Sequence, residues 1–255
     1  MKTAFCALLS ALAAMVNFSF AQSPGNDPKA VGIITQMEEK LNLEGGDVTS
    51  VFTLVQRKEG EADRVLKVKV YRRDSIKKFT LIFQYPESEK GKGYYRGGDD
   101  LYLYLPSTRE FVYRNRKDDV GSTDVRTDLF GKLDILKQYT VRYEGQRQIA
   151  KFDCDVVELN ALALDVSFPV QKWYIRKSDG LPAKVENFSA SKTLLRTFYY
   201  IDYKEVKTGK FLFSKLMAVN NLEKDQRTLL SNEEIGSTAI PDYTFSKAFL
   251  EEQSR

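Results

Sequence analysis

The chain of 255 residues carries 39 Lys and Arg against 35 Asp and Glu, which gives a formal net charge of +4. This excess is too small, for a chain of this size, to indicate nucleic-acid binding. The absence of histidine excludes Ser-His and Cys-His nucleophile pairs, the HExxH zinc motif and imidazole acid-base chemistry.

The N-terminal residues have the pattern of a secretory signal peptide. An apolar run from Ala4 to Val16 follows Lys2, and small residues precede an expected cleavage after Ala21. The run falls short of the roughly 20 apolar residues that a membrane span needs. We therefore expect residues 1–21 to be removed and residues 22–255 to form one soluble domain.

The cysteine count bears on the compartment. Cys154 is the only cysteine that remains after cleavage, so no internal disulfide can form. Export without disulfides fits a bacterial periplasm better than a disulfide-stapled extracellular module. Cys154 itself is predicted to be a buried strand residue, because Asp153 and Asp155 would raise its pKa.

An amphipathic helix is predicted at the start of the mature chain. Asp27 and Pro28 suit the N-cap and the first helical position. Apolar residues then recur at helical spacing until Gly45 and Gly46 end the run; they are Ala30, Ile33, Ile34, Met37 and Leu41.

Two series of strands follow, separated by a helical stretch. The first series is predicted at residues 51–55, 64–73, 77–85, 94–95, 101–105 and 110–114. In "GSTDVRTDLFGKLDILKQY" a cap at Ser122 or Thr123 precedes apolar residues at helical spacing, with Gly131 as a break. The second series is predicted at residues 139–143, 149–159, 166–176, 183–189, 194–204 and 211–222, and a last helical turn lies in "YTFSKAFLEEQ". We expect about ten antiparallel strands.

Alternation within the strands predicts a continuous apolar face. Leu66, Val68 and Val70 share one face of their strand, and Phe79, Leu81 and Phe83 share one face of the next. A sheet of this size tends to curl and enclose its concave face. Side chains could fill that face completely as core, or leave a cavity for an apolar guest. The pattern alone does not separate these two possibilities.

Several segments resemble the LolA-like outer membrane lipoprotein-sorting proteins, which include periplasmic lipoprotein carriers. "GGDDLYLYLP" is similar to the family's central hairpin, "YRRD" to its basic motif at a strand end, and "GSTDVRTDLF" and "YTFSKAFLEE" follow in the same order. Asp74 stands where the carriers usually have proline, and Tyr102 where they have tryptophan. The resemblance covers nearly the whole mature chain.

The resemblance implies a mainly β fold with α-helices: a half-open antiparallel β-barrel, with the helices as a lid over an apolar cavity. The cavity would shield the acyl chains of lipoproteins, or other lipids, in transit between the inner and outer membranes, without catalysis or a cofactor. Expected partners are the lipid cargo, an inner-membrane transporter and an outer-membrane acceptor, with transient membrane contact. The alternative is a periplasmic lipid-binding sensor or interaction protein on the same fold.

The residues that would form this site follow from alternation and from the resemblance together. Trp173 suits either plain core or the cavity wall, and the parity of residues 101–105 is open because both of their faces are apolar. The predicted cavity residues are Leu66, Val68, Val70, Phe79, Leu81, Phe83, Leu101, Leu103, Leu105 and Trp173. The predicted lid residues are Ile33, Met37, Leu129, Phe130, Leu133 and Leu136, and by the resemblance Arg73 helps to hold the lid closed.

No catalytic or metal site is expected. The candidate carboxylate pairs are Asp99 with Asp100, Asp118 with Asp119, and Asp153 with Asp155. The first pair lies in a predicted turn and the second in a predicted loop, where aspartate is favoured for its hydrogen bonds to the backbone.

Overall fold

The computed structural model describes residues 25–115 and 118–254, so the predicted signal peptide lies outside the described residues. The first group of strands in chain order is β1 (Asp47–Arg57), β2 (Arg64–Arg73), β3 (Lys78–Tyr85), β4 (Gly93–Gly97), β5 (Asp100–Leu105) and β6 (Glu110–Arg114). The second is β7 (Tyr139–Ile149), β8 (Phe152–Ala161), β9 (Val170–Arg176), β10 (Pro182–Phe188), β11 (Leu194–Lys207), β12 (Lys210–Asn220) and β13 (Arg227–Gly236).

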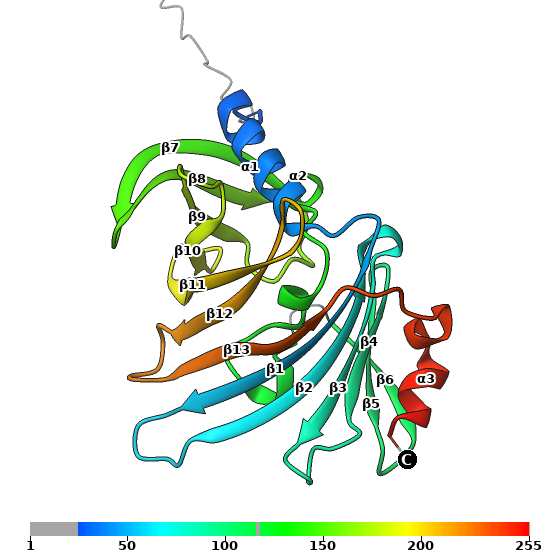
Figure 1. Ribbon diagram of the computed structural model, residues 1–255. Helices are drawn as coiled ribbons and strands as arrows, with labels where there is room; N and C mark the ends of the chain where they lie inside the picture. The colour runs from blue at the N-terminus through cyan, green and yellow to red at the C-terminus, as the bar shows by residue number, and fades with distance from the viewer. Residues whose placement is uncertain (1–24, 116–117, 255) are drawn as a thin grey trace, which may run out of the picture.

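These strands form one curved antiparallel sheet with the order β6-β5-β4-β3-β2-β1-β13-β12-β11-β10-β9-β8-β7 (Figure 1). The edge strands β6 and β7 do not pair, so the half-open barrel of the prediction is an open, curved sheet. The expected count of about ten strands was too low, because the described residues contain thirteen. The strand that the sequence pattern missed, β13, joins the two series by pairing with β1 and β12.

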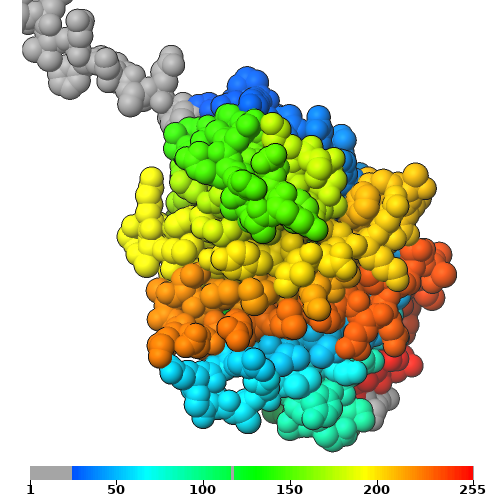
Figure 2. All heavy atoms as spheres, turned by 60° about the vertical axis from the view of Figure 1, so that its left-hand side comes forward, coloured from blue at the N-terminus to red at the C-terminus, as the bar shows by residue number. Residues whose placement is uncertain are grey.

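Figure 2 shows the same order from another side of the molecule. The orange C-terminal strands lie between the yellow strands of the second series and the blue and cyan strands β1 and β2. Alternation in β13 is clear only at Thr228 and Leu230, which are buried. The run Asn232, Glu233 and Glu234 then breaks the pattern, and this is why the strand was not recognised.

The helices lie on both sides of the sheet. They are α1 (Pro28–Leu41), α2 (Ile135–Gln138) and α3 (Lys247–Glu252), with 3-10 turns η1 (Asp74–Ile76), η2 (Val120–Ser122), η3 (Thr127–Phe130) and η4 (Asp242–Phe245). The prediction for α1 is confirmed: the Asp27 side chain caps it by accepting from the backbone N–H groups of Lys29 and Ala30. The expected helices between the strand series are η2, η3 and the single turn of α2.

The inner, concave face of the sheet carries the main core. Phe79, Leu81 and Phe83 of β3 and Leu101 and Leu103 of β5 all belong to this buried cluster. This settles the parity of β5: its leucines face inward and its tyrosines face outward. Phe52 of β1 packs on Phe130 edge to face, with ring centroids 5.1 Å apart.

The outer face of β3, β4 and β5 is covered by α3. Leu250 of α3 packs with Ile82 and Tyr104 in a second buried cluster, and the ammonium of Lys247 lies 3.2 Å from the ring centroid of Tyr102. Gly93 of β4 allows this close approach, because a Cβ atom there would lie 2.5 Å from Leu250. Both faces of β5 are apolar because both are covered.

Candidate functional site

A segment that links the two edge strands runs along the concave face. We call residues 118–138 the crossing segment; it contains η2, η3 and α2 and follows the inner side of the curve (Figure 1). Val120, Val125 and Phe130 are buried in the same cluster as the inward side chains of β2, β3 and β5. Four of the six apolar residues predicted for the lid lie here, namely Leu129, Phe130, Leu133 and Leu136.

Glycine permits the closest contact between the crossing segment and the sheet. Gly121 has a φ of +55°, and a Cβ atom there would lie 2.8 Å from Leu66 and 3.0 Å from Phe83. The backbone therefore rests directly on two of the predicted cavity residues. The crossing segment thus covers the concave face directly at Leu66 and Phe83.

A buried carboxylate fixes the crossing segment to the central strands. The side chain of Asp124 is fully buried and accepts from Oγ1 of Thr228 at 2.8 Å, Nε2 of Gln226 at 2.6 Å and Nδ2 of Asn220 at 3.2 Å. Nε of Arg196 lies 3.7 Å from the same carboxylate. Buried charge is stable only with such partners, so Asp124 acts as the anchor of the segment.

The crossing segment is also joined to α1. Nδ2 of Asn42 donates to the carbonyl of Leu133 at 2.8 Å, and Oδ1 of Asn42 accepts from the backbone N–H of Leu133 at 2.9 Å. Glu38 accepts from the N–H of Ile135, and Lys132 pairs with Glu44. Helix α1 and the crossing segment thus form one connected cover over the concave face.

The end of α1 is held by a buried ion pair that the sequence analysis did not identify. Arg72 donates to Asp74 through Nε at 2.6 Å and through a terminal nitrogen at 2.7 Å, and Asp74 also accepts from the N–H of Leu43 at 2.6 Å. Burial raises the pKa of Asp74, but Arg72 and the Leu43 N–H outweigh it and leave that pKa below its ordinary value. Asp74, at the position where the resemblance expects proline, therefore anchors the chain after α1.

Arg73, the residue that the resemblance assigns to the lid, contacts a different part of the molecule. Its guanidinium donates to Asp47 of β1 at 2.6 and 2.7 Å, and it also pairs with Asp242 and with the carbonyl of Ile240. The guanidinium carbon lies 4.5 Å from the ring centroid of Phe245. These contacts join β1 and β2 to the C-terminal segment, and a role in lid control stays a prediction.

An apolar hollow lies beside the crossing segment, over the second half of the sheet. Its floor comes from β9, β10 and β11, and its walls come from the crossing segment, the start of β7 and the loop before β9. Its cavity volume is about 90 Å³, within a depression of about 750 Å³ that includes open solvent. The apolar lining residues are Leu129, Leu133, Ile135, Tyr139, Val166, Phe168, Trp173, Val185, Phe198 and Tyr200. Binding pockets for small ligands commonly measure about 300–1,000 Å³, so the hollow would have to widen to hold one.

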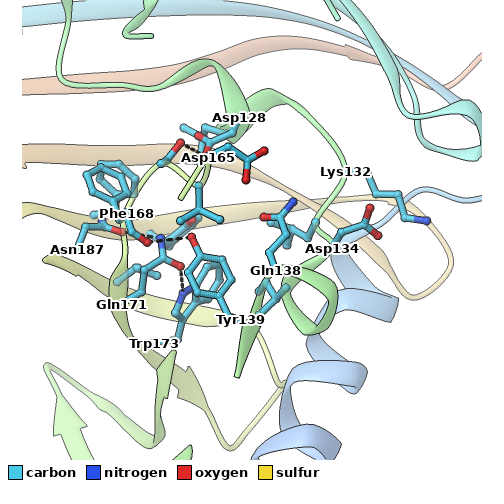
Figure 3. A pocket seen from close by; sticks show the side chains of 18 of the residues that line it. Asp128, Lys132, Asp134, Gln138, Tyr139, Asp165, Phe168, Gln171, Trp173 and Asn187 are labelled. Atoms are coloured by element: carbon cyan, nitrogen blue, oxygen red, sulfur yellow. Dashed lines mark hydrogen bonds between the residues drawn. The ribbon is translucent and has the colours of Figure 1, made fainter. Parts of the chain in front are cut away.

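Polar groups stand at two levels of the hollow (Figure 3). Acidic side chains in the lining include Asp128, Asp134 and Asp165; Ser167 donates to Asp128, and Asp134 pairs with Lys77 outside the lining. On the floor, Gln171 and Asn187 lie between aromatic side chains. The hollow therefore combines an apolar body with a few placed polar groups.

The predicted site residues divide between these two regions. Trp173, Leu129 and Leu133 line the hollow, whereas Phe83 and Leu103 border a second, more polar space near Arg64 and Arg114. Most of the others belong to the packed core, with Ile33, Leu105 and Leu136 at its margin. Assignment of the whole set to lipid binding stays a prediction. Sequence reasoning missed the inward polar residues Gln171 and Asn187, whose signal was a polar side chain at an inward position of the alternation.

Two remaining sequence predictions concern chemistry. Cys154 is fully buried in β8, and burial raises the pKa of its thiol to about 11, in keeping with the predicted strand role. Within residues 25–115 and 118–254, no three His, Cys, Asp or Glu side chains are grouped closely enough to hold a metal ion. In the same residues, no helix has the length and hydrophobicity to cross a membrane.

Comparison with solved structures identifies proteins of similar fold. The chain is similar to a LolA superfamily protein from Nitrosomonas europaea, with 18% identity over 86% of this chain and 98% of that one and a TM-score of 0.76. A candidate outer membrane lipoprotein-sorting protein domain from Vibrio parahaemolyticus shows 18% identity over 88% and 98%, with a TM-score of 0.77. A DUF1329 family protein from Desulfovibrio piger shows 14% identity over 89% and 100%, with a TM-score of 0.78.

These structures confirm the resemblance to the LolA-like proteins at the level of the fold. A search of curated proteins found no match. A family model described only as "Uncharacterized protein" matches residues 75–252, which is more than half of the chain. The chain therefore belongs to the family of that model, and its fold is the LolA-like fold.

Proposed function

We propose that the protein is a lipid carrier that binds acyl chains against the concave face of the sheet, in the periplasm, and moves them between membranes. The observation that supports this best is the hollow, which inward side chains of β9, β10 and β11 line together with the crossing segment. Its cargo would be the acyl chains of lipoproteins or of other lipids. A transporter in the inner membrane and an acceptor in the outer membrane would complete the route.

The free energy of transfer into water explains why acyl chains need a carrier, and the size of the hollow explains why its cover would have to move. Burying one methylene group is favourable by about 0.8 kcal/mol, so exposing an acyl chain of about sixteen carbons to water costs roughly 12 kcal/mol. At about 90 Å³ the hollow is too small for even one full-length chain, and we infer that the crossing segment shifts to enlarge it. Beside its buried apolar contacts, this cover is held by hydrogen bonds and ion pairs, as at Asn42 and Asp124, which can exchange with water.

The carrier proposal is tested with residues 22–255 purified without detergent, by native mass spectrometry with lipid extraction and by uptake of a fluorescent acyl probe. Phe198 lines the hollow, whereas Ile201, on the opposite face of β11, is 49% exposed. We expect Phe198→Glu to abolish lipid uptake, because a carboxylate in the floor opposes an apolar chain.

Ile201→Glu is the matched control and should bind as the unmodified protein does. Circular dichroism and a thermal melt would establish that both variants are folded. Undiminished uptake by a folded Phe198→Glu variant, or absence of any bound or acquired lipid in the unmodified protein, would contradict the proposed function.

A further inference from the structure

Three polar side chains on the floor of the hollow form a directed chain of hydrogen bonds. The indole N–H of Trp173 donates to Oε1 of Gln171 at 3.0 Å, and Nε2 of Gln171 donates to Oδ1 of Asn187 at 2.8 Å (Figure 3). An indole nitrogen can only donate, so it determines which end of the Gln171 amide faces it. The other end of that amide must donate, and it therefore meets the oxygen of Asn187.

This chain leaves one donor group without an acceptor. Nδ2 of Asn187 is buried and, among the described residues, has no hydrogen-bond partner. Asn187 lines the hollow, as do Phe168, Trp173, Val185 and Phe198, whose side chains offer no strong acceptor. A buried unpaired donor is destabilising by about 1–3 kcal/mol. The floor of the hollow thus carries a fixed N–H group that an acceptor atom of a ligand would satisfy.

We propose that Nδ2 of Asn187 binds the carbonyl oxygen of an ester-linked acyl chain in the hollow. This inference rests on the proposed lipid-binding function and names the chemical group that the site selects. A plain hydrocarbon or an ether-linked chain has no carbonyl to accept this hydrogen bond. The carbonyl oxygen lies next to the apolar chain, as the position of Asn187 among aromatic side chains requires.

The charges around the hollow favour an ester over a free fatty acid. Asp128, Asp134 and Asp165 all line it, against the two basic side chains Lys132 and Arg96. Pairing outside the lining removes one charge of each sign from this balance, because Lys132 pairs with Glu44 and Asp134 pairs with Lys77. A free carboxylate would enter a region in which carboxylates already outnumber cations, whereas an ester carries no charge.

Access to Asn187 depends on the same movement as acyl-chain entry. The side chain has no exposed surface, so a ligand carbonyl reaches it only after the crossing segment or the loop with Phe168 moves aside. A site that pairs a buried polar group only with the correct ligand discriminates strongly against analogues that lack the matching atom.

Trp173 is the only tryptophan of the chain and lies in the site, so its fluorescence reports binding without a label. We would titrate residues 22–255 with dioctanoylphosphatidylcholine, with its ether-linked analogue of the same chain length, and with octanoate. The ester lipid should bind about fivefold to tenfold more tightly than the ether lipid, as expected for one hydrogen bond. Octanoate should bind more weakly than the ester.

The variant Asn187→Leu should bind both lipids and lose the ester preference. Asn232→Leu is the matched control, because Asn232 of β13 also has a buried unpaired atom but does not line the hollow, and it should keep the preference. If Asn187→Leu does not fold, the side-chain amide resonance of Asn187 in the unmodified protein should shift with the ester lipid and not with the ether lipid.

The outcomes separate this inference from the proposed function. Equal binding of ester and ether lipid, or an ester preference that survives in Asn187→Leu, would overturn the role of Asn187 and leave the carrier proposal intact. Octanoate binding that is tighter than ester binding and lost in Asn187→Leu would overturn the ester assignment in favour of a free fatty acid. Failure of the unmodified protein to bind either lipid would overturn the proposed function itself.

Discussion

Inward side chains of both halves of the sheet belong to the main core, but those of β1–β6 mostly pack against the crossing segment, whereas several of those in β9–β11 also line the apolar hollow. Both halves follow the same alternation and carry aromatic residues on their inner faces. The difference lies in what covers them: Gly121 brings a backbone directly onto Leu66 and Phe83, while Phe198 and Val185 line the hollow. Apolar alternation identifies the inner face, and the covering segment decides whether that face is core or cavity.

The outer faces of the two halves of the sheet also differ. Helix α3 covers β3, β4 and β5, and its Leu250 is fully buried against them. No helix of the described residues covers the outer face of β11 in this way, and Ile201 is exposed there. The β1–β6 half is thus layered on both sides of β3–β5, whereas the β9–β11 half carries no helix of the described residues on its outer face.

The largest effect should come from truncating an aromatic residue in each half. Phe79 is buried in the packed core, so Phe79→Ala should lower the free energy of unfolding by about 3–5 kcal/mol. Phe198→Ala should cost about half as much, because Phe198 lines the hollow and loses fewer contacts. Urea unfolding followed by circular dichroism measures both. Equal losses would show that the two halves are packed alike and would break the comparison.

A smaller effect should follow from removing the anchor of the crossing segment. Asp124→Ala leaves Thr228, Gln226 and Asn220 without their shared acceptor, and we expect a loss of about 2–4 kcal/mol. Amide hydrogen exchange should rise mainly in residues 118–138, and acyl-probe uptake should become faster. Asp202→Ala, at an exposed aspartate of β11, should change stability by less than about 0.5 kcal/mol. Unaltered exchange in the crossing segment would remove Asp124 from this role.

The smallest effect is the acid sensitivity of the α1 anchor. The pKa of Asp74 is held below its ordinary value of 3.8 by Arg72 and the Leu43 N–H, despite burial. A carboxyl group with a lowered folded-state pKa stabilises the protein above its unfolded-state pKa, and this stability is lost as the pH falls through the folded-state pKa. The free energy of unfolding should therefore decrease as the pH drops below about 4.

Asp74→Asn should lose stability at neutral pH and then show a shallower decline in acid. The decline should persist in part, because Arg73 lowers the pKa of Asp47 in the same way. Denaturant melts at several pH values provide the measurement. An acid slope identical to that of the unmodified protein would exclude Asp74 as a contributor.

Local sequence patterns predicted much of the fold. The Asp27 cap with Pro28 placed α1, and alternation placed Leu66, Val68 and Val70 on the inner face. Such features depend on neighbouring residues only. Strand β13 was not predicted because half of it is polar. Its position at the centre of the sheet is set by its pairing with β1, which is distant in the sequence, and with β12, which is not recognisable from its own pattern.

The site itself was less accessible to sequence reasoning. The partners of Asp124 come from β12, β13 and the turn between them, about 100 residues along the chain. Whether an apolar side chain is packed or borders the hollow depends on side-chain volumes brought together from distant segments. Gln171 and Asn187 had a local signal, polar residues on inward positions, but their shared hydrogen bonds require the pairing of β9 with β10.

The pairing of β1 with β13 also shapes how the chain reaches its folded state. The register joins Arg57 to Arg227, so this pairing closes a very long loop, which is slow. As the chain emerges from its N-terminus, β1–β6 can form a meander and β7–β12 a second one, each mostly by short connections. Until residues 227–236 arrive, β1 and β12 present unpaired strand edges, which are prone to association with other chains. The centre of the finished sheet is thus the last part to close, and the newly made protein most needs protection from aggregation there.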